Sequence, residues 1–254
     1  IKSIVYYHSQ IVKQRLIKSV FEYMQHSYFS TSKIVLTSSP NMHKYSPIIK
    51  NLQNVKILPI WVDAKEVNQN KKTEALEKTK DFYFFLGRNS YYKGITILMQ
   101  AIEIYFNKGG KYNFVIAGDD FKISFHEKFK NRVLLLKESI DEQEKFSYLR
   151  SARTFLFPSI EVSEAFGIVQ VEAMSQGIPV INTSLKSGVP WVSLNKITGL
   201  TVAPKDPKEL ADAILKMDSE ILMTKYGNSA YTRYRDIFSE DSCKPILTRY
   251  FDEL

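Results

Sequence analysis

The chain has 254 residues, of which 44% are hydrophobic and 24% charged, a balance that excludes a disordered or fibrous protein and is ordinary for a globular one. Its formal net charge is +8 and its pI about 9.3, which favours anionic partners such as nucleotides, nucleic acids or an acidic membrane face. The single cysteine, Cys243, excludes an internal disulfide and favours a reducing compartment. No apolar run approaches the ~20 residues that span a bilayer, and no signal peptide is visible. We therefore expect a cytoplasmic protein.

The first 62 residues predict strands that alternate with helices. Strands are predicted at 3–7, 33–37 and 55–60, where short apolar runs occur. Helices are predicted at 11–29 and 42–52, where apolar residues recur at helical spacing. The segment 63–80 is rich in Lys, Glu and Asn and poor in large apolar residues, so it is predicted to be a linker.

A second series of strands and helices follows the linker. Strands are predicted at 82–86, 114–117, 133–136, 155–157, 180–182 and 200–202. Helices are predicted at 95–106, 121–130, 141–152, 168–176 and 208–217. Strands separated by helices pair in parallel through right-handed crossovers, so 81–235 is predicted to be an open, doubly wound α/β sheet. Residues 218–254 read as helical, and 236–254 is expected to pack back toward the first domain.

The first candidate motif is FLGRNSYYKG at residues 85–94. Gly87 ends a predicted strand, Arg88 and Lys93 follow in a loop, and Gly94 opens the next helix. Two cations in front of a helix N-terminus suit a diphosphate, because backbone amides and the helix dipole add to their positive charge. The alternative is a pair of solvated cations at a surface turn.

The second candidate motif, at residues 163–180, carries Glu164 and Glu172 with seven residues between them. Eight steps along a helix advance about 12 Å, so the two carboxylates could lie at opposite ends of one helix side. Such a span suits a sugar at one end and a ribose at the other, since both present hydroxyl donors to carboxylates. The alternative is a helix with an acidic first turn and one ordinary surface glutamate.

The third motif is Gly118 with Asp119 and Asp120, which follows a predicted strand and by itself is typical of a turn. The two aspartates are adjacent, and the chain contains no Asp-x-Asp pair of the kind that binds Mn²⁺ or Mg²⁺ in metal-dependent transferases. We therefore expect no metal site and no cofactor other than a nucleotide-sugar substrate.

Together these motifs resemble family 4 of the retaining glycosyltransferases with the GT-B fold. The resemblance covers about residues 4–250 and includes HSQIVKQ, TSSPNMHKYSPII and ILPIWVD, which are similar to the end of that family's first domain. It also includes SGVPWVSLNKITGLTVAPKDPKELADAI in the second domain. The most similar members are bacterial mannosyltransferases of O-antigen, lipopolysaccharide and exopolysaccharide assembly. The resemblance implies two Rossmann-like domains, of which 1–62 is the end of the acceptor-side domain, so a companion N-terminal segment is expected.

The resemblance also implies the roles of individual residues. Arg88 and Lys93 would hold the diphosphate as it leaves, Glu164 would contact the donor sugar, and Glu172 would bind the ribose. His8 would face the donor sugar across the cleft, although a structural histidine at a strand end is the alternative. The donor-binding residues expected in this way are Gly87, Arg88, Lys93, Gly94, Gly118, Glu164, Ala165, Phe166, Gly167, Ile168 and Glu172.

The activity implied is the transfer of a hexose, by this likeness mannose, from a GDP- or UDP-linked donor to a glycan or lipid-linked acceptor. The anomeric configuration would be retained through a short-lived oxocarbenium ion. The family's glycine-rich loop near the start of the first domain is not present, so this chain alone could bind donor without turnover.

Two other functions stay open: a non-catalytic nucleotide-sugar-binding subunit, and a nucleotide-sugar epimerase. Nucleic-acid binding is suggested only by the net charge, because no basic-aromatic motif of a known reader is present. Several basic residues near the start of the chain could meet an anionic membrane at the inner face, or could form a solvated basic face. These are Lys13, Arg15, Lys18, Lys33, Lys44 and Lys50.

Overall fold

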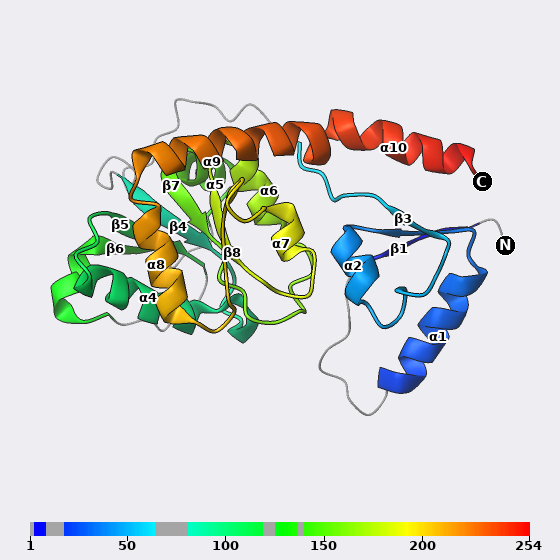
Figure 1. Ribbon diagram of the computed structural model, residues 1–254, viewed down its shortest axis with the longest axis horizontal. Helices are drawn as coiled ribbons and strands as arrows, with labels where there is room; N and C mark the ends of the chain where they lie inside the picture. Colours follow the sequence, from blue (N-terminus) through cyan, green and yellow to red (C-terminus); the bar gives the residue numbers. More distant parts are fainter. Residues whose placement is uncertain (1–2, 9–17, 64–80, 119–124, 137–139) are drawn as a thin grey trace.

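The computed structural model describes residues 3–8, 18–63, 81–118, 125–136 and 140–254 (Figure 1). These residues form two separate parallel sheets, one with three strands and one with six. Two of the sequence predictions, for 63–80 and 119–120, fall almost entirely outside the described residues. Every helix of the described residues is too short or too polar to cross a bilayer.

The first sheet has the order β1-β2-β3 and carries a helix after each of its first two strands. Its elements are β1 (Ile4–Tyr7), α1 (Lys18–Thr31), β2 (Ile34–Thr37), α2 (Pro40–Tyr45) and β3 (Val55–Ile57). All four residues of the central strand β2 are buried, which agrees with a strand covered on both faces.

The second sheet has the order β6-β5-β4-β7-β8-β9, and all of its pairs are parallel. The strands are β4 (Phe82–Leu86), β5 (Asn113–Ala117), β6 (Val133–Leu136), β7 (Ala152–Leu156), β8 (Val180–Thr183) and β9 (Gly199–Val202). The strand order reverses between β4 and β7. In open α/β sheets a ligand binds beyond the carboxyl ends of the strands at such a reversal.

Helices cover both faces of the second sheet. They are α4 (Ile95–Asn107), α5 (Glu142–Ser151), α6 (Ile168–Ser175), α7 (Val189–Val192), α8 (Pro207–Lys216) and α9 (Glu220–Arg233), with the short helices η1 (Tyr91–Lys93) and η2 (Glu127–Arg132). Strand β4 shows how the two cores arise: Phe82 and Phe84 lie in one cluster, and Tyr83 and Phe85 in the other. Because successive side chains of a strand point to opposite faces, an unbroken aromatic run fills both cores.

The chain returns to the first sheet at its end. A π-helical turn, η3 (Tyr234–Phe238), joins α9 to α10 (Glu240–Asp252), and Figure 1 shows α9 along the second sheet and α10 beside the first. Tyr250 is buried with Ile34 and Leu36 of β2 and donates to the Ile57 carbonyl at 3.1 Å. The last helix therefore covers one face of the first sheet.

Three predicted elements differ from the structure. The helix predicted at 42–52 is the shorter α2, which Ser39 caps through the amide of Met42, and which ends before Pro47. Pro47 disfavours a helical conformation at the preceding residue, and Ser46 is indeed extended. The strand predicted at 55–60 ends at Ile57, ahead of Pro59. The helix predicted at 121–130 is the 3-10 helix η2 in its described part.

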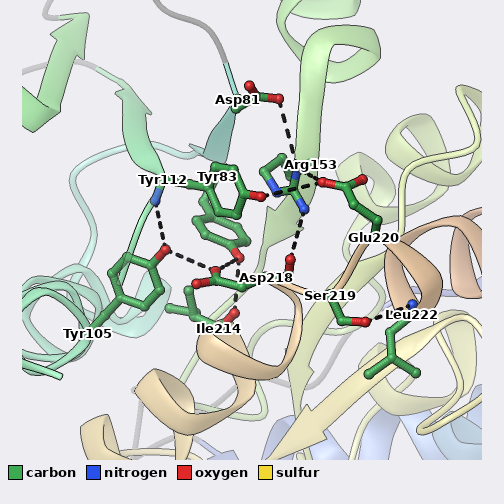
Figure 2. A network of polar contacts seen from close by, with 10 residues as sticks. All are labelled: Asp81, Tyr83, Tyr105, Tyr112, Arg153, Ile214, Asp218, Ser219, Glu220 and Leu222. Atoms are coloured by element: carbon green, nitrogen blue, oxygen red, sulfur yellow. Dashed lines mark hydrogen bonds and ion pairs between the residues drawn. The ribbon is translucent and has the colours of Figure 1, made fainter. Parts of the chain in front are cut away.

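A polar network ties the joint between α8 and α9 to the start of β4 and β7 (Figure 2). Asp218 accepts hydrogen bonds from the hydroxyls of Tyr83 at 2.6 Å and Tyr105 at 2.9 Å. Arg153 is 4% exposed and contacts Glu220 at 2.6 Å and the Asp218 carbonyl at 3.3 Å. This network lies at the amino ends of β4 and β7. It therefore stabilises the edge of the sheet opposite to the carboxyl edge, where a ligand is expected.

Candidate functional site

A pocket of about 440 Å³ lies where β4 and β5 end, and the first turns of α5 and α6 complete its wall. Its lining residues are Leu86, Gly87, Arg88, Lys93, Gly118, Ile140, Asp141, Glu142, Lys145 and Val169. The pocket thus occupies the carboxyl edge beside the reversal of strand order. The structure brings together Gly87, Arg88, Lys93 and Gly118, which the sequence had placed in separate motifs.

The loop after β4 leads into α4 through Gly94. Gly94 has φ 71°, and a Cβ there would lie 2.0 Å from the carbonyl oxygen of Pro158, so only glycine fits. A hydrogen bond joins the same two segments, because the amide of Ile160 donates to the Tyr92 carbonyl at 2.8 Å. The loop that carries Arg88 and Lys93 is therefore packed against the segment that follows β7.

Lys93 and Glu164 form an ion pair beside this pocket. The Lys93 Nζ lies 2.5 Å from Glu164 Oε2, and Ser159 Oγ donates to the same oxygen at 3.2 Å. Both charged side chains are only 12–15% exposed, and Lys93 also lies 5.3 Å from the ring centre of Phe157. The sequence assigned these two residues to different parts of a donor, whereas in this structure they contact each other directly.

Glu172 is a buried residue of α6, and it forms an ion pair with Lys145, which the sequence analysis missed. Its Oε1 lies 2.7 Å from Lys145 Nζ, while its Oε2 has no hydrogen-bond partner among the described residues. Lys145 lines the pocket. The signal that could have found it is the capping box of Asp141 and Glu144, which marks the start of α5 directly after β6.

The two glutamates do not lie on one helix, so that expectation was wrong. Helix α6 begins at Ile168 after Gly167, which adopts φ 79° and packs against the ring of Phe157, so that a Cβ would lie 2.6 Å from it. Glu164 therefore lies in the loop ahead of the helix. The left-handed conformation turns the chain sharply at Gly167, and no helical spacing relates Glu164 to Glu172.

The loop before α6 also contacts the first part of the chain. Ala165 is buried in the same cluster as Val35 and Met42 of the first sheet and its helix. Its carbonyl accepts a hydrogen bond from the Gly188 amide at 2.7 Å, while Asn41 Nδ2 donates to the Ser187 carbonyl at 3.1 Å. The candidate donor loop thus lies where the two parts of the chain meet.

His8 lies just beyond β1 and is exposed, with its ring centre 6.5 Å from that of Tyr6. It is not one of the residues that line the pocket. Ile168 is 41% exposed at the start of α6, whereas Phe166 is buried in the core of the second sheet.

The model of the group 1 glycosyl transferases matches residues 66–233. The chain belongs to this family. O-antigen chain mannosyltransferase C of Escherichia coli is 25% identical over 248 residues, which cover 94% of this chain and 66% of that protein. D-rhamnosyltransferase WbpZ of Pseudomonas aeruginosa is 26% identical over 249 residues, with 93% and 64% covered. This group 1 chain therefore spans about two thirds of the length of these curated relatives.

Solved structures show the same fold. Anabaena HepE in complex with UDP superposes with a TM-score of 0.78 at 17% identity, covering 98% of this chain and 72% of that one. Sucrose-phosphate synthase of Thermosynechococcus elongatus gives a TM-score of 0.76 at 18% identity, with 98% and 67% covered. The predicted GT-B fold, with two Rossmann-like parts that each carry a parallel sheet, is confirmed.

Proposed function

We propose that this chain supplies the nucleotide-sugar site of a retaining glycosyltransferase. The reaction would transfer a hexose, with mannose as the first candidate, from a GDP- or UDP-linked donor to a glycan or lipid-linked acceptor. Membership of the group 1 family supports the activity. The observation that carries the proposal is the pocket at the reversal of strand order, which Arg88 and Lys93 line and where Lys93 pairs with Glu164.

In the proposed reaction the nucleoside diphosphate must leave with its negative charge. Arg88 and Lys93 would stabilise that charge, and the α6 N-terminus would add backbone amides and its dipole. When the diphosphate engages Lys93, the Glu164 carboxylate is released to accept hydrogen bonds from hydroxyls of the donor sugar. We propose that positive charge then builds on the sugar as an oxocarbenium ion, which Glu164 stabilises and the acceptor attacks from the face that the diphosphate vacates.

Glu172 is the proposed ribose ligand. Lys145 holds one of its carboxylate oxygens, and the second oxygen is buried and has no partner among the described residues. An unpaired buried acceptor is costly, and a ribose hydroxyl would remove that cost. His8 is proposed to face the donor sugar from the first sheet.

The identity of the donor's sugar and base is supported only by what the names of similar proteins say. The relative from E. coli is named a mannosyltransferase and that from P. aeruginosa a rhamnosyltransferase, while HepE was solved with UDP and with UDP-glucose. A companion N-terminal segment and contact with anionic lipid remain part of the proposal. The segment is proposed because the curated relatives are longer than this chain. The lipid contact is proposed from the basic residues among the first 50.

The test is a panel of UDP, GDP and dTDP with their sugars, measured by thermal shift and calorimetry in the presence and absence of EDTA. A ligand at 100 times its Kd stabilises the folded state by ~2.7 kcal/mol, which is readily seen as a rise in Tm. We expect one base to stand out, with an affinity that EDTA leaves unchanged. A chain that binds none of these nucleotides would contradict the proposal, and a large loss on chelation would contradict metal independence.

A further inference from the structure

A set of buried polar side chains lies behind the loop that precedes α6. Asn182 on β8 and Gln170 on α6 are both 0% exposed. Asn182 Nδ2 donates to Gln170 Oε1 at 2.9 Å and to the carbonyls of Val189 and Ser193 at 3.0 and 3.1 Å. Its Oδ1 accepts from Thr201 Oγ1 at 2.7 Å. The network therefore joins α6, β8, β9 and the α7 segment.

Gln170 connects this network to the loop itself. Its Nε2 donates to the carbonyl of Phe166 at 3.0 Å. The same amide lies against Gly167, because a Cβ built on that glycine would be 2.8 Å from Gln170 Nε2. Asn182 fixes the orientation of the Gln170 amide, since its donor can face only the oxygen and leaves the nitrogen of Gln170 turned toward the loop.

Holding a carbonyl also fixes the amide on the other side of the same peptide plane. The peptide bonds of the described residues are trans, and in a planar trans peptide the C=O and N–H point in opposite directions. Gln170 holds the Phe166 carbonyl, and Gly188 holds that of Ala165. The amides of Gly167 and Phe166 therefore point away from these partners, and neither donates to another described residue.

Burying these polar groups costs desolvation energy, and apolar side chains of similar volume could join the same elements. Apolar side chains could not set the direction of a peptide plane, because they cannot donate a hydrogen bond to its carbonyl. We propose that Gln170 and Asn182 are positioning residues that aim the Gly167 amide at the donor diphosphate. Gln170 acts directly on the peptide and Asn182 acts through Gln170. This inference rests on the proposed function.

The experiment compares Gln170→Met with Gln176→Met in the full chain. Both substitutions remove an amide from α6 or its C-cap, but Gln176 bonds to Ser175 and Arg150 and not to the loop. GDP and UDP are titrated by calorimetry, and guanosine and uridine by saturation-transfer NMR. We expect Gln170→Met to weaken the diphosphate on the order of tenfold, as loss of an aligned hydrogen bond to a charged group does. The nucleoside should be unaffected, and Gln176→Met should change neither.

A second substitution covers the case in which Gln170→Met does not fold. Thr201→Val removes the hydrogen bond to Asn182 at the far end of the network, on a half-buried residue. It should weaken the diphosphate in the same selective way, by a smaller factor. Equal losses of diphosphate and nucleoside that track a lowered Tm would overturn the positioning role. Failure of the wild-type chain to bind either diphosphate would instead overturn the proposed function, and this inference with it.

Discussion

Lys93 and Glu164 form an ion pair that a bound donor would have to separate. Both side chains are mostly buried, so their attraction is screened less than that of a surface pair. A diphosphate carries more negative charge than one carboxylate and can replace Glu164 as the partner of Lys93. The same exchange would free Glu164 for the sugar, so the two residues would act in sequence on one ligand.

Lys93→Ala should weaken a nucleoside diphosphate far more than the matching monophosphate. A charge-assisted contact to the distal phosphate contributes roughly 1.5–3 kcal/mol, and the monophosphate lacks that group. Calorimetry with both nucleotides measures the difference. Lys108→Ala, which removes an exposed cation paired with Asp212, is the matched control and should change neither affinity. Equal losses for the two nucleotides would show that Lys93 does not contact the distal phosphate.

Substitution of Glu164 and of Glu172 should affect the binding of different ligands. Glu172→Ala should weaken the free nucleotide and the nucleotide-sugar alike, by roughly 1.5–3 kcal/mol, because both contain the ribose. Glu164→Ala should leave the free nucleotide no weaker, since it releases Lys93. It should reduce the rate of sugar transfer by more than it reduces donor affinity, because charge builds on the sugar only in the transition state. Matched losses on both ligands for Glu164→Ala, following a lowered Tm, would contradict the sugar role.

At the scale of elements, the joint between α8 and α9 is set by Asp218, on which two tyrosine hydroxyls from β4 and α4 converge. Asp218→Ala should lower the free energy of unfolding by about 1–3 kcal/mol per hydroxyl left without its charged partner. Asp212→Ala, on the exposed side of α8, should cost little because its pair with Lys108 is solvated. Urea denaturation of both variants checks the difference, and similar midpoints would refute the role given to Asp218.

The same tyrosines predict a loss of stability at alkaline pH. Burial, and then the hydrogen bond to Asp218, raises the pKa of Tyr83 above its ordinary value of 10.0. Burial likewise raises the pKa of Tyr105. The unfolded chain then releases these protons first, so the stability is fully present below about pH 10 and is lost as the pH rises beyond it. Unfolding measured from pH 8 to 11 should show this decline, and Tyr83→Phe should reduce its slope. An unchanged slope would contradict the assignment to Tyr83.

At the scale of the whole molecule, the chain's two sheets are joined by η3 and α10, which follow α9. Tyr234 Oη donates to the Val62 carbonyl at 3.0 Å, and the Val62 amide donates to the Phe238 carbonyl at 3.1 Å. Beyond them Tyr250 packs on the first sheet. The first sheet is therefore held to the rest of the chain by an element that is remote from it in sequence.

Tyr250→Ala should destabilise the first sheet selectively. Truncation of a buried aromatic side chain costs roughly 3–5 kcal/mol, and here that cost falls on the cluster around β2. Hydrogen exchange at the β2 amides should accelerate strongly, while the amides of β4 keep their protection. Phe251→Ala, at an exposed side chain of the same helix, is the control. Equal acceleration in both sheets would show that they unfold as one unit.

The sequence by itself was sufficient for the fold and for the strand ends at which chemistry is expected. Unbroken apolar runs such as Phe82–Leu86, separated by helices, require a parallel sheet covered on both faces. The carboxyl ends of such strands meet at one edge, which agrees with Gly87 and Gly118 lining one pocket, although the sequence assigned them to a common site only through the family resemblance. These features depend on periodicity, which is local.

Only the tertiary structure decided which side chains meet. The pairs Lys93–Glu164 and Lys145–Glu172 join residues 71 and 27 positions apart, and no local spacing encodes them. The predicted helix at 168–176 begins after Glu164, but only the packing of the left-handed Gly167 against Phe157 sets where the chain turns before it. The buried amides of Gln170 and Asn182 read as ordinary polar residues until folding brings them together behind the loop that precedes α6. Long-range packing sets these contacts, and the sequence pattern sets only the elements that carry them.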